Sequence, residues 1–165
     1  MWEKATRVAR TKREVMDQSF TPQRKETADL YGDGAFALLK ERTEVGAKHC
    51  FGELSDAERN RLAYEVSLIL ATHSAKVFLY WADAVAKIKQ TTYPYIFGVQ
   101  NCSLVSFCLG ITEVDPLQTD SCFERLLNRR SVQVPKLFAE VPNGKRAEKW
   151  SRLSEDERTV TEIEE

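Results

Sequence analysis

Four basic residues in the second half of the chain could contact nucleic acid. They are Arg125, Arg129, Arg130 and Lys136. Arginine and lysine side chains pair with phosphate oxygens, and binding of this kind weakens steeply as the salt concentration rises. These residues are therefore the candidates for a local nucleic-acid contact, if the chain has one. Ordinary surface arginines are the alternative, because the net charge of the chain is −1 and excludes a chain-wide polycation.

The N-terminal segment, residues 1–27, is also rich in basic residues. Arg7, Arg10, Lys12 and Arg13 lie in it, before Pro22. The pattern predicts a frayed helix followed by a loop, whose basic face either touches nucleic acid or is simply solvated. The segment has no apolar region typical of a signal peptide, and no run of the sequence approaches the ~18 apolar residues of a membrane span. We expect a cytoplasmic protein with no membrane partner.

Tyr93, Tyr95 and Phe97 form an aromatic stretch that is interrupted by Pro94. Aromatic rings either stack on nucleotide bases or supply buried area to a core. The β-branched and aromatic composition indicates a short strand or loop. We expect these rings in the core, with nucleotide stacking as the alternative.

Cysteine and histidine could together hold a metal ion. The candidates are Cys50, Cys102, Cys108 and Cys122, with His49 and His73. No two cysteines have the CxxC spacing typical of zinc sites. We expect reduced, mostly buried thiols, and a zinc site is the alternative.

The elements that position these residues are mainly helical. At 165 residues, with 42% hydrophobic and 30% charged residues, the chain fits one globular domain. Ser55 and Glu58 have capping-box spacing and predict a helix start, and that helix should stop near His73. Its expected core stripe is Leu62, Val66, Ile69 and Leu70.

Two further helices flank this one in the sequence. Residues 26–43 predict a helix interrupted near Gly32 and Gly34, because glycine lowers helix stability. After His73, Val77, Phe78, Trp81, Val85 and Ile88 predict a second amphipathic helix. We expect it to pack antiparallel to the helix that begins at Ser55.

Residues 98–141 predict a compact series of short elements. A buried helix from Asn101 to Leu109 should end at Gly110, and a turn is expected at Asp115-Pro116. Asp120 could cap a second helix, whose inward side chains are Phe123, Leu126 and Leu127. A β-rich run follows over residues 132–141. The sequence thus predicts a mainly helical α+β fold with a small sheet near residues 93–98 and 132–141.

The charged tail, residues 142–165, offers another capping box at Ser154 and Glu157. We expect the side chains of Trp150 and Leu153 to pack this tail against the rest of the protein. The acidic end, TEIEE, is predicted to be exposed or disordered.

Several motifs occur together in one order: RLAYEVSLI, VFLYWADAVAKIK, SLVSFCLGITEVDPL, FERLLN and VQVP. Over Ala28–Val141 they resemble the start of the palm region of the bacterial DNA polymerase III alpha subunit family, which includes error-prone relatives. The resemblance implies part of a nucleotidyltransferase-type palm that serves DNA replication. It also implies DNA or replication proteins as partners.

Two motifs of that family are altered here. The family's GRGS motif, which helps to hold nucleotide phosphates, falls on Ile96–Val99 and leaves only Gly98. Ser103 matches a later family serine, but we expect it to hydrogen-bond the backbone of its own helix, with a nucleotide-loop role as the alternative. The family's PDIDIDF motif supplies metal-binding carboxylates, and here only Glu140 is acidic. Lys136 and Phe138 occupy the other two carboxylate positions.

One carboxylate cannot hold two divalent ions, so the resemblance implies no catalytic residue and no cofactor. Magnesium at Glu140 is expected only if some polymerase chemistry survives. The predicted function is a member of the polymerase family that is inactive by itself. An interaction module, a non-catalytic DNA-binding protein and a poorly folding remnant are the alternatives. We also expect that the palm lacks its usual neighbouring domains, which would expose apolar surface for self-association.

Overall fold

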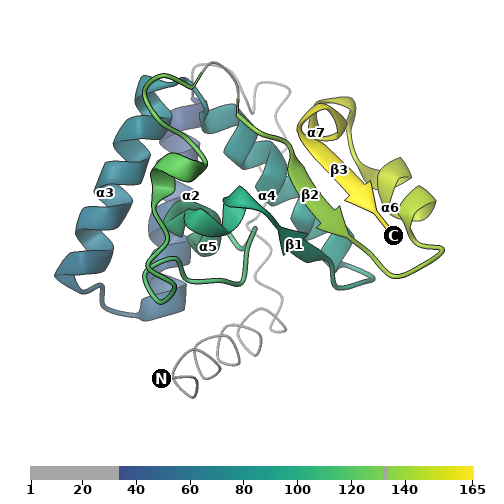
Figure 1. The fold of residues 1–165 in the computed structure, drawn as a ribbon, viewed down its shortest axis with the longest axis horizontal. Helices are drawn as coiled ribbons and strands as arrows, with labels where there is room; N and C mark the ends of the chain where they lie inside the picture. Colours follow the sequence, from purple (N-terminus) through teal and green to yellow (C-terminus); the bar gives the residue numbers. More distant parts are fainter. Residues whose placement is uncertain (1–33, 132–133) are drawn as a thin grey trace.

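The computed structural model describes residues 34–131 and 134–165. The predicted N-terminal helix and loop lie outside this range. Two of the three long helices lie on one side of the molecule and a small sheet lies on the other, with the third long helix behind the sheet (Figure 1). The helices are α2 Ala35–Phe51, α3 Asp56–Ala71 and α4 Ala75–Lys89. The prediction of a mainly helical α+β fold is confirmed.

Helix α2 runs to Phe51, well beyond the end predicted near Thr43. Gly46 lies within it and marks a close packing contact, not a break. A Cβ atom added at Gly46 would lie 2.0 Å from the backbone oxygen of Cys108. The absence of a side chain therefore lets α2 pass directly over the backbone of the Cys108 segment.

Helix α3 begins as predicted, because Ser55 and Glu58 complete the capping box. The Ser55 Oγ accepts a hydrogen bond from the Glu58 amide at 3.3 Å, and a Glu58 carboxylate oxygen accepts one from the Ser55 amide at 2.7 Å. The predicted stripe is only partly right. Leu62 and Ile69 are buried, but Leu70 is 49% exposed, and Glu65 is buried in the same helix.

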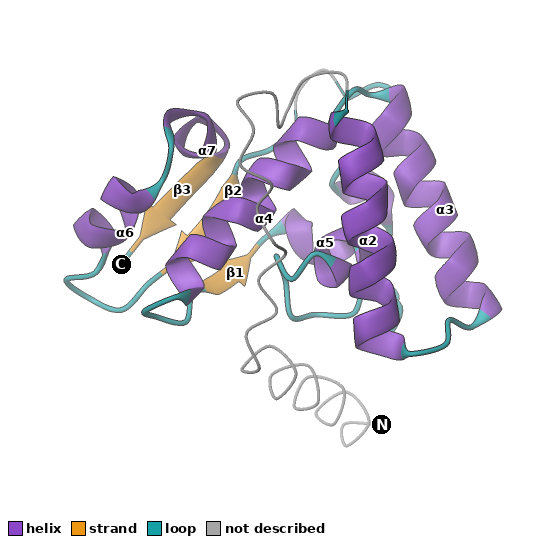
Figure 2. Cartoon of the chain, turned by 180° about the vertical axis from the view of Figure 1, so that it is seen from behind, coloured by secondary structure: helices purple, strands orange, loops and turns teal. Residues whose placement is uncertain are grey.

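Helix α4 buries Phe78, Trp81, Val85 and Ile88, as its spacing predicts. The predicted antiparallel pairing with α3 is wrong, because the direction of the chain turns by 113° between the two helices. Helix α4 instead packs across α2 and behind the sheet (Figure 2). Within the described residues no single helix has the length and apolarity of a membrane span, although α3 and α4 taken as one bent pair reach that threshold.

The chain then forms β1 Tyr95–Phe97, the 3-10 helix η1 Val99–Cys102 and α5 Leu104–Cys108. Gly110, with φ +77°, follows α5 in the left-handed conformation expected of it. The turn predicted at Asp115 is confirmed. An Asp115 carboxylate oxygen accepts a hydrogen bond from the Leu117 amide at 2.9 Å.

The second amphipathic helix predicted after Asp120 is wrong. Only a single 3-10 turn forms, η2 Phe123–Arg125, and no side chain caps it. Asp120 has φ +51°, so the chain bends there. The expected inward residues Phe123, Leu126 and Leu127 are nonetheless buried, because one turn suffices to direct three side chains spaced three and four apart to the same side.

The sheet has the order β1-β2-β3, where β2 is Leu137–Glu140 and β3 is Thr161–Glu164. Strand β2 pairs antiparallel with β1 and parallel with β3. The two predicted sheet regions are confirmed. The prediction that TEIEE is exposed or disordered is wrong, because Thr161 and Ile163 are buried in β3. Their alternation with Glu162 and Glu164 is a strand pattern that the acidic composition obscures.

Two short helices, α6 Arg146–Arg152 and α7 Glu155–Val160, join β2 to β3. The capping box at Ser154 is present, as predicted. Leu153 packs with Ile88 and Ile163 in a second small core, while Trp150 is 36% exposed. The Lys87 ammonium pairs with Glu157 at 2.6 Å, which ties α7 to α4.

Candidate functional site

Strands β1 and β2 bring the two altered motifs side by side. Their register places Tyr95 opposite Glu140, Ile96 opposite Ala139 and Phe97 opposite Phe138. Residues that are about forty positions apart in the sequence thus become neighbours. This pairing is the centre of the candidate site.

The loop after β1 is held by its own side chains. Gly98 has φ +99°, a backbone conformation that favours glycine. Gln100 is 1% exposed, and its side-chain amide donates to the backbone oxygen of Lys136 at 2.8 Å. The Asn101 amide donates to the backbone oxygen of Ile96 at 3.3 Å. The loop therefore fixes the entry of β2, and it carries no guanidinium that could pair with phosphate.

The side chains on the adjoining strands do not fit a pair of magnesium ions. Phe97 and Phe138 stack with ring centroids 5.7 Å apart. Lys136 and Glu140 are exposed at the two ends of the β2 segment. Magnesium prefers oxygen ligands. The side chains of Glu140, Lys136 and Phe138 offer one carboxylate, one ammonium group and one phenyl ring. Within residues 34–131 and 134–165, no three His, Cys, Asp or Glu side chains are grouped to hold a metal ion.

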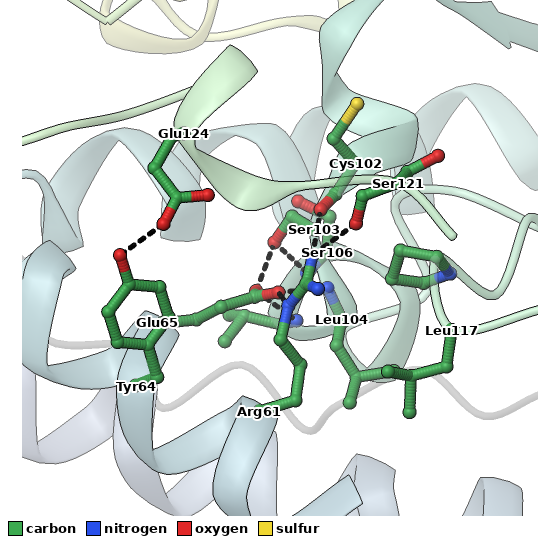
Figure 3. Close-up of polar contacts among 12 residues, drawn as sticks. Arg61, Tyr64, Glu65, Cys102, Ser103, Leu104, Ser106, Leu117, Ser121 and Glu124 are labelled. Atoms are coloured by element: carbon green, nitrogen blue, oxygen red, sulfur yellow. Dashed lines mark hydrogen bonds and ion pairs between the residues drawn. The ribbon is translucent and has the colours of Figure 1, made fainter. Parts of the chain in front are cut away.

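A buried polar centre lies beside this region, where α3 meets the start of α5 (Figure 3). Glu65 is fully buried. Its carboxylate accepts hydrogen bonds from the backbone amides of Leu104 and Val105 at 2.9 and 3.0 Å, and from the Ser103 hydroxyl at 2.8 Å. The Arg61 guanidinium donates a fourth bond at 2.6 Å. We call these residues, Arg61, Glu65 and Ser103, the Glu65 centre.

The Glu65 centre joins three separate segments of backbone. Arg61 also donates to the backbone oxygens of Cys102 and Ser121, each at 2.8 Å. The Ser103 hydroxyl accepts from the Ser106 amide at 3.0 Å, so the expectation that Ser103 hydrogen-bonds the backbone of its own helix is confirmed. Burial raises the pKa of the Glu65 carboxyl, and the surrounding donors oppose that rise. The centre is a structural clamp, because its polar atoms are used in holding the chain.

Comparison with known proteins agrees with this arrangement. Residues 37–156 match the family model described as the bacterial DNA polymerase III alpha NTPase domain. The chain belongs to this family. The resemblance inferred from the motifs is thereby confirmed.

Named relatives include error-prone DNA polymerases and DNA polymerase III alpha subunits. The chain is 33% identical over 126 residues to an error-prone DNA polymerase of Methylococcus capsulatus, covering 73% of this chain and 12% of the relative. It is 33% identical over 114 residues to the DNA polymerase III subunit alpha of Halalkalibacterium halodurans, covering 67% of this chain and 10% of that relative. The corresponding subunit of Mycobacterium tuberculosis is 30% identical over 120 residues, covering 71% of this chain and 10% of the subunit. The chain thus spans about a tenth of the length of these relatives.

The FER segment of the family motif is tied to α3. The Tyr64 hydroxyl donates to the Glu124 carboxylate (Figure 3). This hydrogen bond holds the pKa of Glu124 below its usual value and raises the pKa of Tyr64. Glu124 therefore anchors η2, which agrees with a structural role for this part of the motif.

The four predicted nucleic-acid-binding residues lie on two different elements. Arg125, Arg129 and Arg130 are exposed in η2 and the turn after it. The charge of Arg129 lowers the pKa of Tyr64, although other groups outweigh it, so Arg129 lies toward α3. Lys136 instead directly precedes β2, next to the loop that follows β1. Their contact with nucleic acid stays a prediction.

The remaining candidates differ from expectation in their burial. All four cysteines are free, as predicted, and Cys102 and Cys108 are buried whereas Cys122 is exposed. The prediction of core positions for the aromatic stretch is wrong for Tyr93 and Tyr95, which are 38% and 66% exposed. The reason is strand alternation, which directs Ile96 inward and Tyr95 outward. Sequence reasoning missed the Glu65 centre, although the spacing of four between Arg61 and Glu65 is a signal of an ion pair on one helix face.

Proposed function

We propose that this chain is a non-catalytic member of the DNA polymerase III alpha family that keeps the palm framework without the nucleotidyl transfer. One observation carries the proposal, namely the pairing of Phe97 with Phe138. The family resemblance implies a phosphate-binding arginine and a metal-binding carboxylate at these two positions. A phenyl ring performs neither task, because it offers no charge to phosphate and no oxygen to magnesium.

The neighbouring charges support the same proposal. Transfer by two metal ions needs several oxygen ligands that hold both ions close together. Glu140 is the only acidic residue at the three carboxylate positions, and Lys136 adds a positive charge to the same strand segment. The replication activity of the relatives is therefore not carried over to this chain.

A primer-extension assay tests this proposal. Purified chain, a primed template and all four deoxynucleotides are incubated with magnesium or with manganese, and a DNA polymerase III alpha subunit from a relative serves as the positive control. We expect no extension by this chain. Extension that is lost in Glu140→Gln but kept in Glu162→Gln would overturn the proposal, since Glu162 is a glutamate on the neighbouring strand.

DNA binding without catalysis is a second candidate function. It is supported by the exposure of Arg125, Arg129 and Arg130 around η2. The test is fluorescence anisotropy with labelled single-stranded and primed DNA over a range of salt concentrations. Replacement of the three arginines by alanine should weaken binding and reduce the salt dependence, by about 0.7 in logarithmic slope per lost contact with single strands. Lys136→Ala, tested alone, separates the contribution of β2. Wild-type binding with no salt dependence would contradict this function.

We propose two kinds of protein partner, replication proteins and a second copy of the chain. We also propose that the protein is located in the cytoplasm. Exposed apolar side chains support self-association, since Val45 and Leu70 are 50% and 49% exposed. Sedimentation at several concentrations is the test. A single monomeric species at every concentration would contradict self-association.

A further inference from the structure

The outward face of the sheet combines aromatic and acidic side chains. Two cross-strand rows form it. The first row is Phe97, Phe138 and Glu162, and the second is Tyr95, Glu140 and Glu164. We call these six residues the aromatic-acidic face. The alternate residues of the same strands, such as Ala139 and Ile163, are buried on the opposite face.

The three rings form a continuous layer along this face. The centroids of Tyr95 and Phe97 are 6.1 Å apart with their planes at 16°, and those of Phe97 and Phe138 are 5.7 Å apart with their planes at 27°. Tyr95 is 66% exposed, and the other two rings are partly exposed. Helix α4 covers the opposite side of the sheet (Figure 2), while no helix within the described residues crosses the aromatic-acidic face (Figure 1).

Glu140, Glu162 and Glu164 give this face a negative charge, which the exposed Lys136 at the start of the β2 segment offsets by one. Within the described residues, no lysine or arginine side chain forms an ion pair with Glu140, Glu162 or Glu164. The register places Glu140 directly between Tyr95 and Glu164. Carboxylates beside stacked rings repel phosphate, so they disfavour the nucleotide-stacking alternative at this surface. The combination favours a cation.

We propose that the aromatic-acidic face binds a basic, arginine-containing peptide segment of a partner protein. A guanidinium group is attracted to a ring face within about 6 Å of its centroid. Neighbouring strands are about 4.8 Å apart, so a carboxylate lies within reach of a cation placed over the adjacent ring. Arginine suits both contacts better than lysine, because its planar group stacks on rings and pairs bidentately with carboxylates.

This inference goes beyond the proposed function. It rests on the register and exposure of the sheet, and it does not depend on whether the chain extends a primer. Charge complementarity favours the basic peptide over single-stranded DNA and a neutral peptide, and a second copy of the chain is one of the outcomes that the test distinguishes.

The experiment is a titration of the full chain with fluorescently labelled probes at low salt. The binding probe is an eight-residue peptide of alternating arginine and glycine. Its matched control replaces each arginine with citrulline, which keeps the shape and removes the charge. An eight-nucleotide oligothymidine tests the nucleic-acid alternative. We expect saturable binding of the arginine peptide, and binding of both other probes that is at least about tenfold weaker.

Variants locate the binding surface. Tyr95→Ser should weaken binding of the arginine peptide by about threefold to fivefold, and Glu140→Gln with Glu164→Gln by about tenfold. Glu44→Gln is the control, because Glu44 is an exposed glutamate on α2. Thermal melts followed by circular dichroism show whether each variant stays folded, and all replaced side chains are exposed.

Four results would overturn the inference. The first is equal affinity for the arginine and citrulline peptides. The second is tighter binding of oligothymidine than of the arginine peptide. The third is an equal loss of binding in Glu44→Gln and in the glutamate pair, since that would show attraction to overall negative charge. Concentration-dependent sedimentation that Tyr95→Ser abolishes would also overturn it, by assigning the face to a second copy of the chain.

Discussion

The Glu65 centre and the aromatic-acidic face lie near each other in the fold but differ in how their polar groups are used. In the Glu65 centre, one buried carboxylate meets four donors from two segments, α3 and the start of α5. On the aromatic-acidic face, exposed carboxylates stand beside stacked rings without an ion pair from the described residues. The contrast teaches that the residues that pack the fold can be kept while the exposed residues on the sheet change. The packing residues are fixed by their burial, whereas the exposed side chains are not needed for the fold.

The largest effect that separates the two regions is expected from Glu65→Ala. It leaves the Arg61 charge and two backbone amides without their acceptor, so the free energy of unfolding should fall by about 3 to 5 kcal/mol. Urea denaturation followed by circular dichroism measures this loss. Glu44→Ala, on the exposed surface of α2, should change stability by less than about 0.5 kcal/mol. Equal stability of the two variants would show that the Glu65 centre is not a clamp.

Gly46→Ala should be the next most damaging change. The added methyl group would collide with the backbone oxygen of Cys108, and overpacking of this kind costs about 1 to 3 kcal/mol. Gly34→Ala is the matched control, because no heavy atom lies within 4 Å of a Cβ at that position. A thermal melt compares the two variants. A stable Gly46→Ala protein would indicate that α2 and α5 can move apart.

Lys89 gives the helical region a distinct response to pH. Its ammonium group donates to the backbone oxygen of Gly110 at 2.9 Å, and burial lowers its pKa from 10.5 to about 8. Between these two values the unfolded chain binds the proton and the folded chain does not, so the free energy of unfolding should rise with pH, by at most about 3 kcal/mol.

Urea denaturation at pH 8 and at pH 10 measures this rise. In Lys89→Met, the free energy of unfolding should not rise between these two pH values. Lys40→Met, at an exposed position on α2, should retain the rise. A stability that falls equally in all three proteins would contradict the lowered pKa.

The smallest effect on stability is expected on the aromatic-acidic face. Tyr95→Thr exchanges a mostly exposed ring for a residue that also suits a strand. We expect a change of less than about 1 kcal/mol in the free energy of unfolding. A loss as large as that of Glu65→Ala would erase the contrast between the two regions, and would show that the ring belongs to the core.

Local signals in the sequence predicted many elements because their causes lie within a few residues. The capping boxes at Ser55 and Ser154 satisfy backbone amides one turn away, and Gly110 ends α5 through its own backbone freedom. The motifs CLGIT and VDPL, followed by FERLLN, were together specific enough to indicate the family. The same signals failed at Asp120, where a polar residue of the type that caps helices lies in a bend.

The sequence by itself therefore determined the helical character, the start of α3 and the family. The proposal that the chain is non-catalytic also starts from the sequence, which has Phe97, Lys136 and Phe138 where the family resemblance implies an arginine and two carboxylates. Only the tertiary structure decided that Glu65 is buried, that Phe97 faces Phe138, and that the acidic end forms β3. The physical reason is distance along the chain. A carboxylate is stable inside the protein only when donors from remote segments meet it, and a short acidic strand is ordered only when a neighbouring strand accepts its hydrogen bonds.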